Sequence, residues 1–292
     1  MLDQAQRLRE LARKEKNNYD TFTEGNESVK IITVTSGKGG VGKSNFVVNL
    51  GISLQKMGKS VLIFDADVGM GNDDVLMGFL PRYNVYDIIF NNKEIEEVVI
   101  EGPYGIKLLA GGTGINKIDE IDQDKRDNFL NKLSNLKGLD YILMDTGAGI
   151  NRTVLGFISC CEELVIITTP EPTSLTDAYS LMKAVNHFNI KNSAKVIINR
   201  VLDSEEGVRT FNKFKSAADR FLNIKLEHLG SISEDKKLIQ SVRMQKPLVI
   251  NYPNSEAAED INNVALKLMG SNINKNREGI QGLFKKIFSI FS

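Results

Sequence analysis

The stretch of sequence that decides the fold reads Ser36-Gly37-Lys38-Gly39-Gly40-Val41-Gly42-Lys43-Ser44. It satisfies the phosphate-loop pattern, in which a glycine is followed by four residues and then by Gly-Lys-Ser or Gly-Lys-Thr. Residues 29–35 before it are apolar like a buried strand, and residues 46–54 after it carry apolar side chains at helical spacing. The alternative, a glycine turn between a strand and a helix, requires neither Lys43 nor Ser44. We therefore interpret the stretch as a nucleotide-binding loop that carries a second lysine, Lys38.

Each residue type in this loop has a physical task in binding a polyphosphate. Glycines have no Cβ, so backbone N–H groups can approach the phosphate oxygens closely. The helix that begins near Lys43 directs its unsatisfied N–H groups at the β-phosphate, and the lysine adds a charge for the β and γ oxygens. The hydroxyl of Ser44 can bind Mg²⁺. The loop residues expected to contact ATP are Gly39, Gly40, Val41, Gly42, Lys43, Ser44 and Asn45.

The composition and the order of apolar runs predict an α/β fold. The chain has 292 residues, of which 41% are hydrophobic, so it can bury a large core. Strand-like and helix-like runs alternate, which is typical of a mostly parallel sheet with helices on both faces. We expect one P-loop domain over residues 29–269, preceded by a charged helix at 2–16 and a linker up to 28. Its strands are expected at residues 29–35, 60–65, 106–110, 141–145, 163–168, 195–199 and 226–230.

The charge balance and the cysteine content of the chain argue against several classes of protein. Lys plus Arg and Asp plus Glu number 37 each, so no global field favours nucleic acid as a partner. The cysteines are the neighbours Cys160 and Cys161, whose spacing fits neither a disulfide nor a metal site. No apolar run precedes Glu24, so neither a signal peptide nor a membrane span is expected there. These features predict a reduced, cytoplasmic protein.

Two groups of carboxylates follow apolar strands. The strand at residues 60–65 delivers Asp65 and Asp67, and the strand at 141–145 delivers Asp145, followed by the flexible Gly147. The carboxyl ends of parallel strands meet at the edge of the sheet where α/β proteins bind ligands. An aspartate beside a phosphate loop can hold Mg²⁺ through water, and a glycine can bring an N–H group close to a γ-phosphate. Helix capping or a polar turn is the alternative for the first two residues.

These motifs together resemble the MinD/ParA family of ATPases. The run from Lys38 to Ser44 is similar to the family's deviant Walker A motif, and residues 65–67 and 145–149 are similar to its two switch segments. The resemblance covers residues 29–269 and implies an ATP-bound homodimer. In that dimer Lys38 would reach the partner's phosphates, Asp67 would orient the attacking water with Asp65 supporting the switch, and Asp145 would hold Mg²⁺ through water.

The same resemblance implies further contacts. Asn199, with its neighbour Arg200, matches the position that reads adenine in the family, and Glu171 and Asp177 match a segment near the dimer face. The chain departs from the family at Ser233, where relatives often have proline, so the packing of adenine against this position is an open question.

Within the family, residues 65–76 and 252–255 most resemble the FlhG (YlxH) branch, which controls flagellar number and placement. The amino terminus agrees, because Gln4, Leu8 and Arg9 resemble the helix with which that branch stimulates an FlhF-type GTPase. Flagellar switch proteins are the other partners implied. Without the resemblance, this segment would be interpreted as a solvated charged helix in which the glutamine has no task.

The carboxyl-terminal segment, residues 270–292, reads as a polar bridge followed by an amphipathic helix. Lysines lie away from its apolar side, which is typical of a helix that lies on a membrane surface. The segment is too short and too charged to span a bilayer. A last helix docked on the core remains the alternative. The apolar stripe consists of Ile280, Leu283, Phe284, Ile287, Phe288 and Phe291.

The sequence therefore favours a dimerising ATPase that cycles between the cytosol and the inner face of the cell membrane. A MinD-like protein of the division site or a ParA-like DNA-partitioning ATPase remains the alternative, and the latter would require basic residues across the dimer surface. A carrier of Fe–S clusters and a scaffold that binds ATP without hydrolysing it are more distant alternatives.

Overall fold

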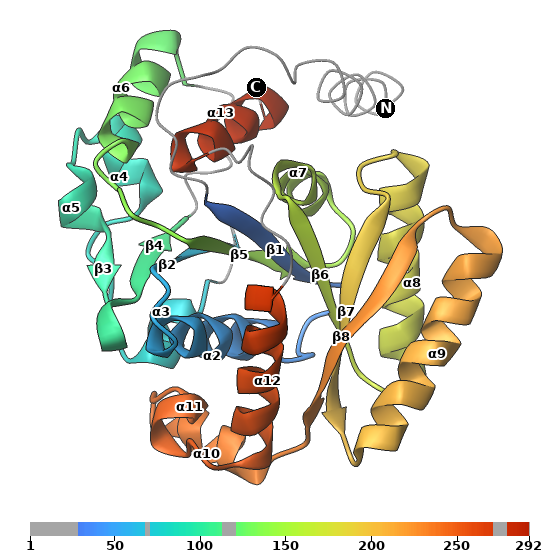
Figure 1. The fold of residues 1–292 in the computed structure, drawn as a ribbon. Helices are drawn as coiled ribbons and strands as arrows, with labels where there is room; N and C mark the ends of the chain where they lie inside the picture. The colour runs from blue at the N-terminus through green and yellow to red at the C-terminus, as the bar shows by residue number, and fades with distance from the viewer. Residues whose placement is uncertain (1–28, 68–70, 113–120, 271–278, 292) are drawn as a thin grey trace.

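A mostly parallel sheet forms the centre of the molecule (Figure 1). The computed structural model describes residues 29–67, 71–112, 121–270 and 279–291. In this part of the chain the sheet has eight strands in the order β3-β4-β2-β5-β1-β6-β7-β8, and every neighbouring pair is parallel except β3 and β4. The strands are β1 (Lys30–Ser36), β2 (Val61–Ala66), β3 (Ile100–Glu101), β4 (Lys107–Ala110), β5 (Tyr141–Ala148), β6 (Glu163–Thr168), β7 (Ser193–Val201) and β8 (Lys225–Ser233).

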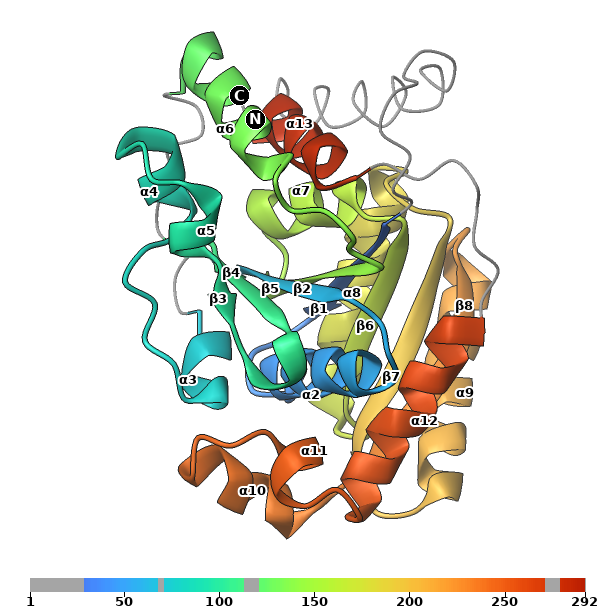
Figure 2. The same ribbon diagram turned by 60° about the vertical axis from the view of Figure 1, so that its left-hand side comes forward.

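Helices cover both faces of the sheet (Figures 1 and 2). The first face is covered by α4 (Val85–Phe90), α5 (Ile95–Val98), α6 (Gln123–Leu133), α7 (Arg152–Cys160), α8 (Pro172–His187), α9 (Ser204–Phe221) and α13 (Ile280–Phe291). The second is covered by α2 (Lys43–Lys56), α3 (Asp73–Met77), α10 (Lys236–Arg243), α11 (Leu248–Asn251) and α12 (Glu256–Gly270). A short 3₁₀ turn, η1 (Pro103–Gly105), precedes β4.

Successive side chains of a strand point to opposite faces of the sheet, so each face has its own hydrophobic core. In β1, Ile31 packs with the first layer of helices, whereas Ile32 and Val34 pack with the second. All three are at most 2% exposed, because a strand with helices on both sides is buried on both sides. The strands therefore read as continuous apolar runs, and this property made them recognisable in the sequence.

The seven strands expected from the sequence are all present, with ends that differ by a few residues. The two-residue strand β3 was not anticipated, because it is too short to show a period. The predicted helix at 2–16, the linker at 17–28 and most of the polar bridge lie outside the described residues. Gln4, Leu8 and Arg9 are therefore untested.

A buried ion-pair cluster joins three strands near their amino ends. Lys30 is 2% exposed and lies 2.6 Å from Oε1 of Glu163, and Lys195 lies 2.9 Å from Oε2 of the same carboxylate. Burial opposes ionisation of Glu163, but hydrogen bonds from the two lysines outweigh it and hold its pKa below the ordinary value. Because removal of one partner would leave a buried charge uncompensated, the cluster fixes β1, β6 and β7 relative to one another.

The carboxyl-terminal helix α13 is docked on the core, between α6 and α7 (Figures 1 and 2). The helix itself is confirmed, and its apolar stripe contacts protein, as the docked alternative expects. Phe284 lies 5.2 Å from the ring of Phe64 in β2 and 4.9 Å from that of Phe129 in α6. The ring of Phe291 lies 5.5 Å from Phe157 in α7. The buried side chains of α13 are Ile280, Leu283, Phe284, Ile287, Phe288, Ile290 and Phe291.

Two polar contacts and a glycine fit α13 to its groove. Gln281 donates to the carbonyl of Leu130 at 2.7 Å, and Arg152 donates to the carbonyl of Ile290 at 3.2 Å. A Cβ at Gly156 in α7 would lie only 2.5 Å from Cζ of Phe291, so the side chain of Phe291 occupies the space that glycine leaves free and would have to shift for any larger residue. Among the described residues, no helix is long and apolar enough to cross a bilayer.

Candidate nucleotide-binding site

The phosphate loop joins β1 to α2 in a conformation that depends on its glycines. Gly40 and Gly42 have φ angles of 78° and 92°, which L side chains rarely adopt. A Cβ at Gly42 would also lie 2.4 Å from Nδ2 of Asn199. At the start of the loop, a Cβ at Gly37 would lie 2.1 Å from the carbonyl carbon of Asp177. The loop can therefore pack against the backbone of α8 only because glycine stands there.

Lys43 lies at the bottom of the loop and is paired with a carboxylate. Its Nζ is 2.6 Å from Oδ1 of Asp145, and the two residues are 8% and 1% exposed. The hydroxyl of Ser44 hydrogen-bonds the same carboxyl group. Burial raises the pKa of Asp145, although Lys43 opposes the rise. The two residues predicted to hold Mg²⁺, Ser44 and Asp145, thus lie together beside the loop lysine.

Asp65 lies in the first switch segment and is buried, and its carboxylate contacts the backbone that follows β2. Its carboxylate accepts hydrogen bonds from the backbone N–H groups of Asp67, at 3.1 Å, and of Asp73. A Cβ at Gly71 would lie 2.3 Å from Oδ2 of Asp65, so glycine is required there. Burial and the charge of Asp145 raise the pKa of Asp65 to about 7. These hydrogen bonds connect Asp65 to the backbone of both Asp67 and Asp73.

Asp67 lies between the second switch segment and a cleft. Its Oδ1 is 3.5 Å from the position that a Cβ of Gly147 would occupy, so its carboxylate lies against that glycine. On the other side it lines a cleft of about 240 Å³, together with Arg82 and the backbone of Gly111. The carboxylate is half-buried, so it can contact both the switch backbone and solvent.

Asp73 belongs to this site and was missed by the sequence analysis. It begins α3 and is fully buried, and its carboxyl group hydrogen-bonds that of Asp145. Burial raises its pKa well above the ordinary value, and the charges of Asp145 and Asp65 add to the rise. In the sequence it reads as one of several polar residues at a helix start, and no local signal distinguishes it from its neighbour Asp74.

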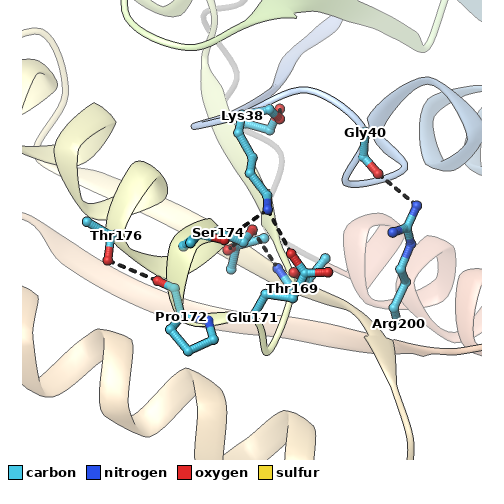
Figure 3. Close-up of polar contacts among 11 residues, drawn as sticks. Lys38, Gly40, Thr169, Glu171, Pro172, Ser174, Thr176 and Arg200 are labelled. Atoms are coloured by element: carbon cyan, nitrogen blue, oxygen red, sulfur yellow. Dashed lines mark hydrogen bonds and ion pairs between the residues drawn. The ribbon is translucent and has the colours of Figure 1, made fainter.

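The second lysine, Lys38, is held by its own chain (Figure 3). Its Nζ lies 2.7 Å from Oε2 of Glu171 and 3.1 Å from Oγ1 of Thr173. The hydrogen bond from Lys38 lowers the pKa of Glu171. Lys38 and Glu171 were both assigned to the dimer face, and in the monomer they contact each other.

Asn199 and Arg200 lie at the carboxyl end of β7 and bind the phosphate loop. Nδ2 of Asn199 donates to the carbonyl of Val41 at 2.7 Å, and the guanidinium of Arg200 donates to the carbonyl of Gly40 at 2.7 Å (Figure 3). Arg200 has a φ of 59°, and its N–H donates to Oδ1 of Asn199. The two residues predicted to contact the nucleotide thus lie at the loop and brace its backbone.

Ser233 stands where relatives often have proline, and its hydrogen bonds require a serine-like residue. Its backbone N–H and its hydroxyl both donate to Oδ2 of Asp260 in α12, at 2.8 and 2.7 Å. Proline has no N–H and could make neither bond. The serine therefore ties the end of β8 to α12.

Comparisons with known proteins agree with this geometry. Residues 32–248 match the model of the CobQ/CobB/MinD/ParA nucleotide binding domain. The chain is 35% identical to the flagellum site-determining protein YlxH of Helicobacter pylori over 92% of this chain and 93% of the relative. It is 33% identical to the antiactivator FleN of Pseudomonas aeruginosa, over 82% and 86%. Among solved structures, the MinD cell division protein of Aquifex aeolicus aligns with a TM-score of 0.64 and 29% identity, over 85% of this chain and all of that one.

Proposed function

The chain belongs to the CobQ/CobB/MinD/ParA family and is an ATPase, and we propose that it uses ATP to switch between a monomer and a membrane-bound dimer that regulates flagellar number or placement. The flagellar assignment is supported by the similarity to YlxH. The switch between solution and membrane rests on one observation, the docking of the amphipathic helix α13 on the core.

The residues around the loop fit ATP and Mg²⁺. The N–H groups at the start of α2 are directed toward the loop, and Lys43 would exchange Asp145 for phosphate oxygens when ATP binds. Ser44 and Asp145 would then hold Mg²⁺, which neutralises phosphate charge when bound. When Lys43 moves to the phosphates, the carboxylate of Asp145 would become available to Mg²⁺. We therefore expect Mg²⁺ and ATP to bind together.

Hydrolysis would require a second copy of the chain. Asp67 would orient the attacking water, and Lys38 would leave Glu171 to contact the phosphates of the partner. The edge that carries the loop also exposes two apolar side chains, Ile150 at 49% and Leu202 at 77%. A second copy of the chain on this edge would remove these two side chains from water, which is favourable for association.

The docking of α13 makes binding to the core and binding to a membrane mutually exclusive. The same apolar side chains would contact either the groove between α6 and α7 or the lipid. Each large apolar side chain contributes about 1.5 to 3 kcal/mol on burial in either place. One helix therefore gains little by leaving the groove. Two helices on one ATP-bound dimer would bind a membrane at high effective concentration, which raises avidity by about 10² to 10⁴.

We further propose that the amino-terminal segment acts on a protein partner. Gln4, Leu8 and Arg9 would stimulate an FlhF-type GTPase, and flagellar switch proteins would be additional partners. The chain has 37 basic and 37 acidic residues, so no global field would attract it to nucleic acid.

Removal of residues 280–292 should abolish ATP-dependent membrane binding. Full-length protein with ATP and Mg²⁺ is expected to sediment with anionic liposomes, and the truncated protein to remain in the supernatant. The control is ATP hydrolysis in solution, which both proteins should retain. Equal sedimentation of the two proteins with ATP would contradict the proposed function.

A further inference from the structure

Exposed apolar side chains gather where the end of α3 meets the end of α10. A Cβ at Gly78, which follows α3, would lie 3.0 Å from the carbonyl oxygen of Gln245, so the two helix ends are in contact. Leu80 is 88% exposed on one side of this contact, and Met244 is 56% exposed on the other. A single exposed apolar residue is ordinary, but several around one contact indicate a surface that another molecule covers.

The helix α10 adds two more apolar side chains to this surface. Ile239 and Val242 are 57% and 39% exposed, and their i, i+3 spacing places them on one side of the helix. Ser241, by contrast, is buried against the core. The name α3–α10 surface is used below for Leu80, Ile239, Val242 and Met244.

The charges around the α3–α10 surface are all of one sign along α10. Residues 236–246 include four basic residues and no acidic one, although the chain as a whole has no net charge. In the described part of the chain these four side chains are exposed and form no ion pair: Lys236, Lys237, Arg243 and Lys246. Complementarity of charge therefore calls for a partner that brings carboxylates.

We propose that the α3–α10 surface binds an acidic amphipathic segment of another protein. The apolar side chains of that segment would contact the surface, and its Asp or Glu residues would face the basic residues of α10. A second copy of this chain that used the same surface would bring basic residues together, which is unfavourable. Nucleic-acid phosphates would leave the apolar side chains without a counterpart, and a helix for a membrane surface usually carries aromatic residues, which this surface lacks.

A partner at this position would contact a helix that is hydrogen-bonded to the first switch segment. The backbone N–H of Asp73, the first residue of α3, donates to the carboxylate of Asp65. The surface lies at the opposite end of the molecule from α13 (Figures 1 and 2). The proposal therefore goes beyond the proposed function, and it requires neither ATP hydrolysis nor release of α13.

The test is a selection of random peptides, displayed on phage, on the full-length protein without nucleotide. Counter-selection uses the double variant Leu80→Ser, Met244→Ser. The enriched peptides should combine apolar residues at helical spacing with an excess of Asp and Glu. Synthetic copies should bind wild type about tenfold or more tightly than this variant. The charge-reversed variant Arg243→Glu, Lys246→Glu should weaken them as well and should reduce the effect of salt on binding.

The control for a change in surface polarity alone is Phe221→Ser, at the end of α9. Phe221 is 66% exposed, and its replacement should leave peptide affinity unchanged. All substituted side chains are exposed, so the variants should keep the wild-type melting temperature, and if one double variant melts early the other decides. Peptides without an acidic excess, or equal affinity for wild type and the folded double variants, would overturn the proposal. It would also be overturned if no surface-dependent peptide emerged and the variants instead lost self-association or binding to anionic vesicles.

Discussion

Asp67→Ala is expected to slow ATP hydrolysis by about 100-fold or more while leaving ATP binding intact. Asp67 lies against Gly147 and lines the cleft. Its proposed task is to orient the attacking water, so its loss should affect only the chemical step. ATP should then accumulate on the protein and trap the dimer. Phosphate release and sedimentation velocity with ATP measure the two effects.

Lys43→Ala is the matched comparison, and its defect should be different. Lys43 supplies the charge for the phosphates, and loss of a buried charged contact costs about 2 to 5 kcal/mol, or roughly 30- to 4000-fold in affinity. This variant should fail to bind ATP and remain monomeric. Equal loss of ATP binding in both variants would contradict the separate roles of the two residues.

Gly156→Leu is expected to release α13 and to produce membrane binding without ATP. A Cβ at this position would lie 2.5 Å from Phe291 and 3.0 Å from Ile290, so a branched side chain cannot share the groove with α13. Overpacking of this kind typically costs about 1 to 3 kcal/mol. Ejection of α13 relieves the overlap and exposes its apolar side chains. Liposome sedimentation in the absence of nucleotide measures the effect.

Two controls separate release of α13 from general misfolding. Gly156→Leu combined with removal of residues 280–292 should lose liposome binding, because the proposed membrane-binding helix is absent. Gly156→Ala should show a smaller effect, since the ring of Phe291 can shift to admit one methyl group. Liposome binding by the truncated double variant would indicate exposure of the core and would contradict the docking account.

The sequence was sufficient for the fold and for most of the site because both depend on local signals. The loop glycines, Lys43 and Ser44 are spaced along a few residues, and apolar strands place Asp65 and Asp145 at one edge of the sheet. Asp73 was missed because its burial arises from packing of α3 against other segments. Nothing in its neighbourhood of the sequence distinguishes a buried aspartate from an exposed one at a helix start.

The position of α13 could not be decided from the sequence for a related reason. An apolar stripe at helical spacing is equally suited to a protein groove and to a lipid surface, since both exclude water. The deciding feature is Gly156, more than 120 residues earlier in the chain. The contact between Lys38 and Glu171 is likewise non-local, because it depends on how closely Gly37 lets the loop approach α8.

The central claim is that occupancy of the ATP site controls whether α13 is docked. Hydrogen exchange of the backbone amides of α13, with and without ATP and Mg²⁺ in the Asp67→Ala protein, tests it most directly. Without nucleotide, the amides of residues 283–290 should be protected, because the helix is packed between α6 and α7. In the ATP-trapped dimer they should exchange much faster. Equal protection in both conditions, with dimer formation confirmed by sedimentation, would contradict the account.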